Sequence, residues 1–227
     1  GAEIRTHYPL EVDTGIAITR QEAWTAREGL DVRIPWFLEE VVERVAFLAR
    51  EDKRVDQRSG VSQRLPITLL ENVVSSAERR AFVQGEDAAV PRLSDLYAAL
   101  PSITGKMELE YEGELHGAEK IAQELISSAA NLTYGHLAGG ADVEEIVAYF
   151  EGGGALQVAD DASADACIQA FTVVPTLLDL IERVGLAPAS ETPGLRAAAC
   201  ELVLEALVAE RRISRIDGGY ARPPFEV

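Results

Sequence analysis

The sequence predicts a mainly α-helical protein in two modules that ends in a β-hairpin. In several long stretches apolar residues recur every three or four positions, which is the spacing of one helix face. Alternation typical of strands is confined to short segments near residues 3–8, 107–111 and 212–222. The chain has 227 residues, 47% of them apolar, so it can bury one good core or two small ones.

The first module is expected to begin with a short strand and a helix. Residues 3–8 alternate polar and apolar side chains up to Pro9, which suits a strand leaving a sheet. A helix is expected over residues 13–27, where Asp13 or Thr14 can serve as the N-cap. Because the opening strand has no partner strand nearby and the first residue is not Met, the chain is expected to be part of a longer protein.

Prolines mark the start of the two helices that follow. Pro35 suits the first position of a helix through Arg50, and Pro66 opens a helix that Gly85 ends. Residues 51–63 between these helices are charged and polar, so they are expected to form a loop. The apolar faces consist of Phe37, Leu38, Val41, Val42, Val45, Ala46 and Leu48 in the first helix and of Leu69, Leu70, Val73, Val74, Ala77 and Ala81 in the second.

The boundary between the modules is expected near residues 105–114. A short helix is predicted over residues 92–100, after which Pro101 and Gly105 interrupt the helical pattern. Residues 107–111 then alternate like a strand or an extended linker. The predicted division is residues 1–12 for the opening strand, 13–105 for the first helical module and 106–227 for the second.

The second module is expected to be helical up to its last residues. Helices are predicted over residues 114–137, 143–150, 162–184 and 195–211. Residues 212–222 are expected to form a hairpin, because Asp217-Gly218-Gly219 supplies glycines that tolerate a positive φ. A helix that leads into a hairpin resembles the end of a winged-helix domain.

The charge of the chain argues against nucleic acid and membranes as main partners. The formal net charge is -17, and residues 111–227 carry 7 basic and 19 acidic side chains. Such a surface repels phosphate backbones and anionic lipids. No apolar run approaches the roughly 20 residues of a membrane span, so a cytoplasmic protein is expected. Cys167 and Cys200 are expected to be small core residues, and no cluster with metal-ligand spacing is present in the sequence.

The most specific motif is Val55-Asp56-Gln57-Arg58-Ser59-Gly60-Val61-Ser62-Gln63-Arg64, directly before the helix marked by Pro66. Ser62 can accept hydrogen bonds from exposed amides of the first helical turn, and Gly60 permits a close approach of the chain. We therefore expect Arg64 to be held in a defined position at the start of the helix.

This stretch is similar to the Gly-x-Ser-x-Arg entrance to the lid helix of AAA+ ATPases of the magnesium chelatase subunit I-like and MoxR-like group. Three further segments support the resemblance. Residues 4–9 look like the last strand of the ATPase core, residues 18–23 like the first lid helix, and residues 105–114 like the segment that follows the lid. The resemblance extends to about residue 135. The family's phosphate loop, acidic magnesium site, sensor 1 and arginine finger would all lie upstream of this chain.

The resemblance implies that residues 13–105 are a AAA+ helical lid and that Arg64 is the sensor 2 arginine, which contacts the γ-phosphate of ATP. Arg58 would be a second nucleotide-sensing residue, supported by Ser59, Gly60 and Ser62. ATP and Mg²⁺ would be cofactors of the whole protein, whereas this chain alone would bind neither and would have no catalytic residue. Its partners would be its own ATPase core, neighbouring subunits of a ring and a client protein that the ATPase remodels.

Three alternatives stand beside this interpretation. Arg64 can be an ordinary exposed arginine paired with an acid such as Asp56. The whole chain can be a non-enzymatic helical module that binds proteins through its acidic second half. It can also be a winged-helix regulator in which Arg212, Arg215 and Arg222 contact DNA. Trp24, Trp36 and Phe37 are expected to pack in the lid, with some apolar surface left for the ATPase core.

Overall fold

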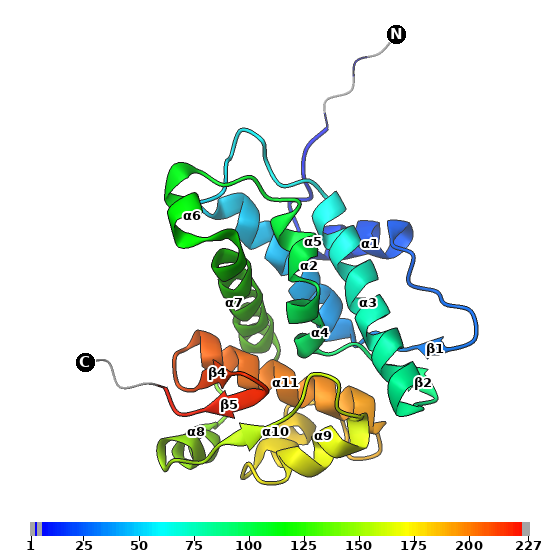
Figure 1. The fold of residues 1–227 in the computed structure, drawn as a ribbon, viewed down its shortest axis with the longest axis vertical. Helices are drawn as coiled ribbons and strands as arrows, with labels where there is room; N and C mark the ends of the chain where they lie inside the picture. The colour runs from blue at the N-terminus through cyan, green and yellow to red at the C-terminus, as the bar shows by residue number, and fades with distance from the viewer. Residues whose placement is uncertain (1–2, 4–5, 224–227) are drawn as a thin grey trace.

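The computed structural model of this protein describes residue 3 and residues 6–223, and in this part of the chain it contains eleven helices and five short strands (Figure 1). The predicted mainly helical fold with a hairpin near its C-terminal end is confirmed. Helix α7 (Ala118–Ala138) is central, because it packs against both α2 (Trp36–Glu51) and α11 (Pro193–Ala209).

The first half of the chain forms the upper part of the molecule in Figure 1. Pro35 is the N-cap of α2, and the apolar face predicted for this helix is buried except for the partly exposed Leu48. The apolar face of α3 is buried as predicted, and Gly85 ends that helix with a φ of 69°. The elements are α1 (Val12–Glu22), β1 (Asp31–Val32), α2, α3 (Arg64–Gln84), β2 (Ala88–Ala89), α4 (Leu93–Ala98) and α5 (Leu100–Thr104), and β1 pairs with β2 in parallel.

The opening of the chain differs from the expectation. Ile4 and Arg5 of the predicted strand lie outside the described residues, and residues 6–9 have no regular structure. Helix α1 begins at Val12 after Glu11, so neither Asp13 nor Thr14 is its N-cap.

Helix α1 also ends at Glu22 instead of residue 27, because residues 24–27 make contacts with α3. The Trp24 amide donates to Glu71, and Arg27 stacks on the Trp24 ring while it pairs with Glu78. The predicted burial is confirmed for Phe37, which is 1% exposed. It is wrong for Trp24 and Trp36, which are 69% and 49% exposed.

The second half ends in a small antiparallel sheet. The predicted hairpin is confirmed, and a third strand, β3, pairs with its second strand to give the order β3-β5-β4. The elements are α6 (Tyr111–His116), α7, α8 (Glu144–Glu151), β3 (Leu156–Gln157), α9 (Ala164–Phe171), α10 (Leu177–Arg183), α11, β4 (Ser214–Ile216) and β5 (Gly219–Ala221).

Two helices predicted as continuous are each divided. The stretch 114–137 is broken at Gly117, whose φ of 91° separates α6 from α7. The stretch 162–184 is divided into α9 and α10, because Pro175 lacks the amide hydrogen that a continuous helix requires and Thr176 adopts a φ of 57°. Pro101 was expected to interrupt the pattern, but it lies in the first turn of α5, where its missing amide is not needed.

A single cluster of buried apolar residues extends from α2 and α3 to α7, α11 and β5. Segment 107–110 belongs to the first half by backbone pairing, since Val55 and Leu109 form an antiparallel bridge and the Asp56 amide donates to the Glu108 carbonyl at 2.8 Å. The division near residue 105 therefore stays a prediction, and the core is continuous across it.

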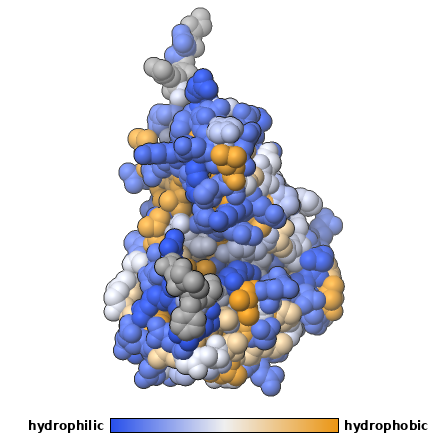
Figure 2. Space-filling view, turned by 60° about the vertical axis from the view of Figure 1, so that its left-hand side comes forward, coloured by the Kyte–Doolittle hydropathy of each residue, from blue (hydrophilic) through white to orange (hydrophobic). Residues whose placement is uncertain are grey.

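The surface is mostly hydrophilic on the face shown in Figure 2, where hydrophobic residues form separate groups instead of one continuous patch. Among the described residues, no helix combines the length and the apolar character needed to cross a membrane. The large apolar side chains with the greatest exposure are Leu10, Trp24, Phe82, Val83, Tyr111 and Leu115.

Replacement by alanine at two glycines inside helices should change the free energy of unfolding in opposite directions. A Cβ atom at Gly15 of α1 would overlap the carboxylate of Glu43, whereas one at Gly135 of α7 would meet no atom within 4 Å. We expect Gly15→Ala to lower the free energy of unfolding by about 1 to 3 kcal/mol. Gly135→Ala should raise it by about 0.5 to 1 kcal/mol, because glycine weakens helix interiors. Urea denaturation of the two variants measures both effects, and a stabilising Gly15→Ala would contradict the packing described here.

Candidate functional site

The loop between α2 and α3 is organised by Asp56. Its carboxylate accepts hydrogen bonds from the Arg58 amide at 2.8 Å and from the Ser59 hydroxyl at 3.2 Å, and its carbonyl accepts from the Gly60 amide at 3.1 Å. The Ser59 hydroxyl also contacts the carboxylate of Glu108. The loop is therefore a compact turn joined to the segment that precedes α6.

Gly60 gives this loop a close contact with the segment before α1. Its φ of 68° favours glycine, and a Cβ atom there would lie 2.5 Å from the Tyr8 hydroxyl. The Tyr8 ring lies under the guanidinium of Arg50, with 4.6 Å between the guanidinium carbon and the ring centroid. The chain that enters α1 thus packs against the loop that leads to Arg64.

Ser62 lies just before α3 and occupies the first amides of the helix. Its hydroxyl accepts from the Arg64 amide at 3.3 Å, and its carbonyl accepts from the Leu65 amide at 3.0 Å. The next residue, Pro66, has no amide hydrogen. The backbone donors of the first turn are already used, so recognition of an anion here depends on the Arg64 side chain.

A buried polar cluster anchors Gln63, the residue immediately before Arg64. The Gln63 amide group donates to both carboxylate oxygens of Glu43, at 2.9 and 3.0 Å, and Thr19 donates to the same carboxylate at 3.0 Å. Arg50 donates to the Gln63 side-chain oxygen at 3.0 Å and to the Val61 carbonyl at 2.9 Å. The helix entrance is therefore joined to α1 and α2. This cluster could not be predicted from the sequence, because a glutamate on a helix is most often exposed.

Burial raises the pKa of the Glu43 carboxyl, although hydrogen bonds from Gln63 and Thr19 and the charge of Arg50 act in the opposite direction. A raised pKa means that the folded state keeps this proton to higher pH than the unfolded state does. The contribution of Glu43 to stability is therefore greatest below its unfolded pKa and decreases as pH rises through the folded one.

This pH dependence can be measured with the variant Glu43→Gln. Relative to the wild type, its free energy of unfolding should increase as the pH is raised from about 4 to about 7, because the variant has no carboxyl to ionise. Glu145→Gln, at an exposed position, is the matched control. A difference that stays flat or falls across this range would show that the carboxylate of Glu43 is not disfavoured by burial.

Arg64 is the first residue of α3, and its side chain is exposed. Its guanidinium makes no ion pair or side-chain hydrogen bond with any residue that the structure describes. Asp56, the acid considered as its partner, instead faces Arg58 at 3.9 Å. Arg58 lies on the same loop with a side chain that is 91% exposed. The structure thus places Arg58, Ser59, Gly60 and Ser62 together in the turn that leads to Arg64.

A second polar cluster lies buried between α4, α11 and the C-terminal hairpin. Glu205 is fully buried and accepts hydrogen bonds from Tyr97 at 2.6 Å, from Tyr220 at 2.8 Å and from Arg215. One helical turn earlier, Glu201 accepts from the Ser94 amide at 2.8 Å and faces Arg92 at 3.4 Å. This cluster joins the two halves of the molecule.

Two of the three arginines considered for DNA contact form ion pairs within the protein. Arg215 is bound to Glu205, and Arg212 pairs with Glu144 at 2.7 Å. Helix α11, which would be the recognition helix of a winged-helix module, is buried on most of its circumference. A DNA-reading helix needs an exposed face in order to enter the major groove.

Both cysteines lie in the core, as predicted, and are free thiols. Burial raises the pKa of the Cys167 thiol to about 11, which leaves it protonated and unreactive at neutral pH. Within the described part of the chain, no group of three His, Cys, Asp or Glu residues is placed to hold a metal ion.

No protein-family model, curated protein or solved structure matches this chain. The resemblance to AAA+ ATPases therefore rests on the sequence motifs.

Proposed function

We propose that this chain is the C-terminal helical part of a AAA+ ATPase, in which Arg64 senses the nucleotide from the lid. One observation carries the proposal: an exposed arginine without a side-chain partner among the described residues stands at the start of a 21-residue helix, and the loop before it is fixed by several hydrogen bonds. An arginine held in this way is suited to a ligand that the chain itself does not contain.

A phosphate group is the ligand that such an arginine suits best. A guanidinium binds phosphate through charge-assisted hydrogen bonds and stabilises the negative charge that develops during phosphoryl transfer. Because Ser62 occupies the amides of the first turn, the side chain of Arg64 is the group that would report the γ-phosphate. Arg58 lies exposed on the same loop and is the second candidate for this role.

The contacts of the loop connect Arg64 to the helices that would move with the nucleotide state. Tyr8 packs against Gly60 and Arg50, so the segment that would arrive from an ATPase core lies directly on the loop. Gln63 connects the same loop to α1 and α2 through Glu43 and Thr19. A shift of Arg64 between nucleotide states would therefore move the helices together, and the ring and its client would respond to that movement. ATP, Mg²⁺, neighbouring subunits and a cytoplasmic location belong to this proposal.

The complete reading frame that encodes residues 1–227 provides the test. We expect it to contain a phosphate loop and an acidic magnesium site upstream, and the purified complete protein should hydrolyse ATP with Mg²⁺. Residues 1–227 alone should show no ATP turnover under the same conditions. A reading frame without a phosphate loop would overturn the proposal and would favour the non-enzymatic protein-interaction module.

A further inference from the structure

Helix α6 turns its apolar side chains toward solvent. Tyr111 and Leu115 are 73% and 72% exposed, whereas Gly113 between them is buried. Successive residues lie about 100° apart around a helix, so the side opposite Gly113 falls between Tyr111 and Leu115. Figure 1 shows α6 at the outer edge of the upper part of the molecule, beside the start of α7. The usual arrangement of a surface helix, with its apolar side toward the core, is therefore reversed in α6.

The backbone of Arg54 fixes the orientation of α6. Its carbonyl accepts a hydrogen bond from the amide of Glu110, directly before the helix, at 2.9 Å. A Cβ atom at Gly113 would lie 2.4 Å from the same carbonyl oxygen, so only glycine allows this approach. A rotation that buried Tyr111 or Leu115 would place a side chain where Gly113 now lies. The apolar pair is thus kept on the surface by the packing of the helix backbone.

Glutamates flank the apolar pair on both sides of the helix. Glu112 and Glu114 occupy the helix positions on either side of the pair, and both are exposed. Neither forms an ion pair with a residue that the structure describes. Residues 108–119 contain five glutamates and no lysine or arginine, and Lys106 and Lys120 lie beyond the two ends of this stretch. The carboxylates of Glu112 and Glu114 are therefore available to cations of a partner.

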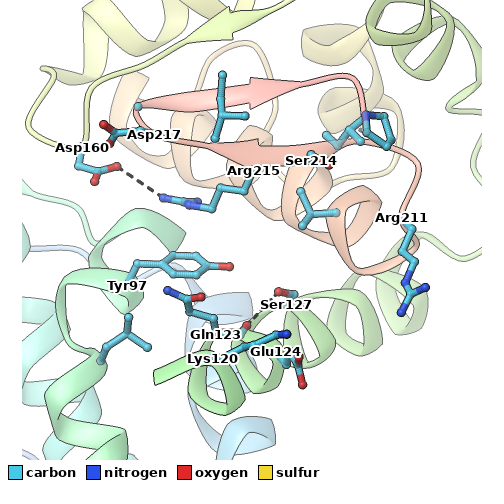
Figure 3. Close-up of a pocket in the computed structure, with 16 residues that line it drawn as sticks. Tyr97, Lys120, Gln123, Glu124, Ser127, Asp160, Arg211, Ser214, Arg215 and Asp217 are labelled. Atoms are coloured by element: carbon cyan, nitrogen blue, oxygen red, sulfur yellow. Dashed lines mark hydrogen bonds and ion pairs between the residues drawn. The ribbon is translucent and has the colours of Figure 1, made fainter. Parts of the chain in front are cut away.

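This combination distinguishes α6 from the cleft of about 800 Å³ between α7 and the turn that joins β4 to β5 (Figure 3). Three basic and three acidic side chains line that cleft, so its charge favours neither sign of partner. In α6, by contrast, an apolar pair lies between unpaired charges of one sign. A surface of this kind selects a partner that is both apolar and positively charged.

We propose that α6 docks a basic segment of a partner protein, in which a large apolar residue stands between Lys or Arg residues. The apolar residue would cover Tyr111 and Leu115, and the cations on either side would pair with Glu112 and Glu114. Nucleic acid and anionic membranes would be repelled by the same glutamates. This docking goes beyond the proposed ATPase and does not depend on nucleotide.

The experiment is a selection with purified residues 1–227 from a displayed library of random peptides of about ten residues. The wild type should enrich peptides in which Leu, Ile, Phe or Trp stands between Lys or Arg residues. A fluorescent copy of one enriched peptide then serves as the probe in anisotropy titrations. Leu115→Ser should weaken its binding about tenfold. The double variant Glu112→Gln with Glu114→Gln should weaken it and make it less sensitive to salt.

Each of these variants has a matched control elsewhere on the surface. Phe82→Ser removes an apolar side chain that is 63% exposed on α3, and Glu145→Gln with Glu151→Gln removes two exposed charges on α8. Both controls should bind the probe like the wild type. Equal weakening by the controls would mean that the peptide follows only the net charge, and this result would overturn the proposal, as would a selection without basic peptides. A dimer of residues 1–227 in light scattering that Leu115→Ser dissociates would make a second copy the occupant and would overturn it as well.

Discussion

Replacement of Glu205 by alanine should lower the free energy of unfolding by about 3 to 5 kcal/mol, the cost of breaking a buried charge pair by removing one partner. Glu205 is fully buried, and the two tyrosines and the arginine that donate to it come from α4, β4 and β5. Without the carboxylate, Arg215 would keep its longer ion pair with Asp160 and its contacts with Tyr97 and Tyr220, and both tyrosine hydroxyls would lose the carboxylate that accepts their hydrogen bonds.

Urea denaturation of Glu205→Ala and of the wild type at neutral pH measures this effect. Glu205→Gln should lose less stability, since the amide keeps an acceptor oxygen for the tyrosines, and the exposed Glu145→Ala should change stability by no more than about 0.5 kcal/mol. A loss below about 1 kcal/mol for Glu205→Ala would mean that apolar packing of α2 on α7, and not the polar cluster, joins the two halves.

In the complete protein, if it is the ATPase proposed above, Arg64→Ala should reduce kcat by about a hundredfold, the effect of removing one charged donor from a developing negative charge. The variant should fold normally, because the Arg64 side chain is exposed and has no side-chain partner among the described residues. Arg64→Lys should restore only part of the rate, since an ammonium cannot bind phosphate in the forked geometry of a guanidinium.

Arg79→Ala is the matched control for this experiment, because Arg79 is an exposed arginine on the same helix. Steady-state ATP turnover of the four proteins at saturating ATP and Mg²⁺ gives the comparison. Equal turnover by the wild type and Arg64→Ala would make Arg64 an ordinary surface residue and would leave the chain as a protein-interaction module.

Local periodicity was sufficient to predict the long helices. The apolar faces of α2 and α3 are visible in the sequence because each helix buries one side, and Pro35 and Gly85 stand at their ends. The division of residues 162–184 was missed even though Pro175 lies in the middle of the stretch. Strand β3 was missed because its two residues are too few to show alternation, and only pairing with β5 makes it a strand.

In the candidate site, too, only the features that depend on neighbouring residues could be predicted from the sequence. The motif around Arg64 is local, and the expected hydrogen bond from its amide to Ser62 and the close approach at Gly60 are both present. The cluster of Glu43, Gln63 and Thr19 joins residues that are distant in the sequence, so no local pattern indicates it. Likewise, Arg215 looked like a free basic residue of a wing, and only the tertiary fold shows that it pairs with Glu205.

We propose that Arg64 contacts the nucleotide, and a structure of the complete protein with a non-hydrolysable ATP analogue and Mg²⁺ tests this proposal most directly. We expect a guanidinium nitrogen of Arg64 at about 3 Å from a γ-phosphate oxygen, within hydrogen-bonding distance, with the loop of Asp56 and Gly60 in the conformation described here. An occupied nucleotide site with Arg64 directed into solvent, and another residue at the γ-phosphate, would contradict the claim.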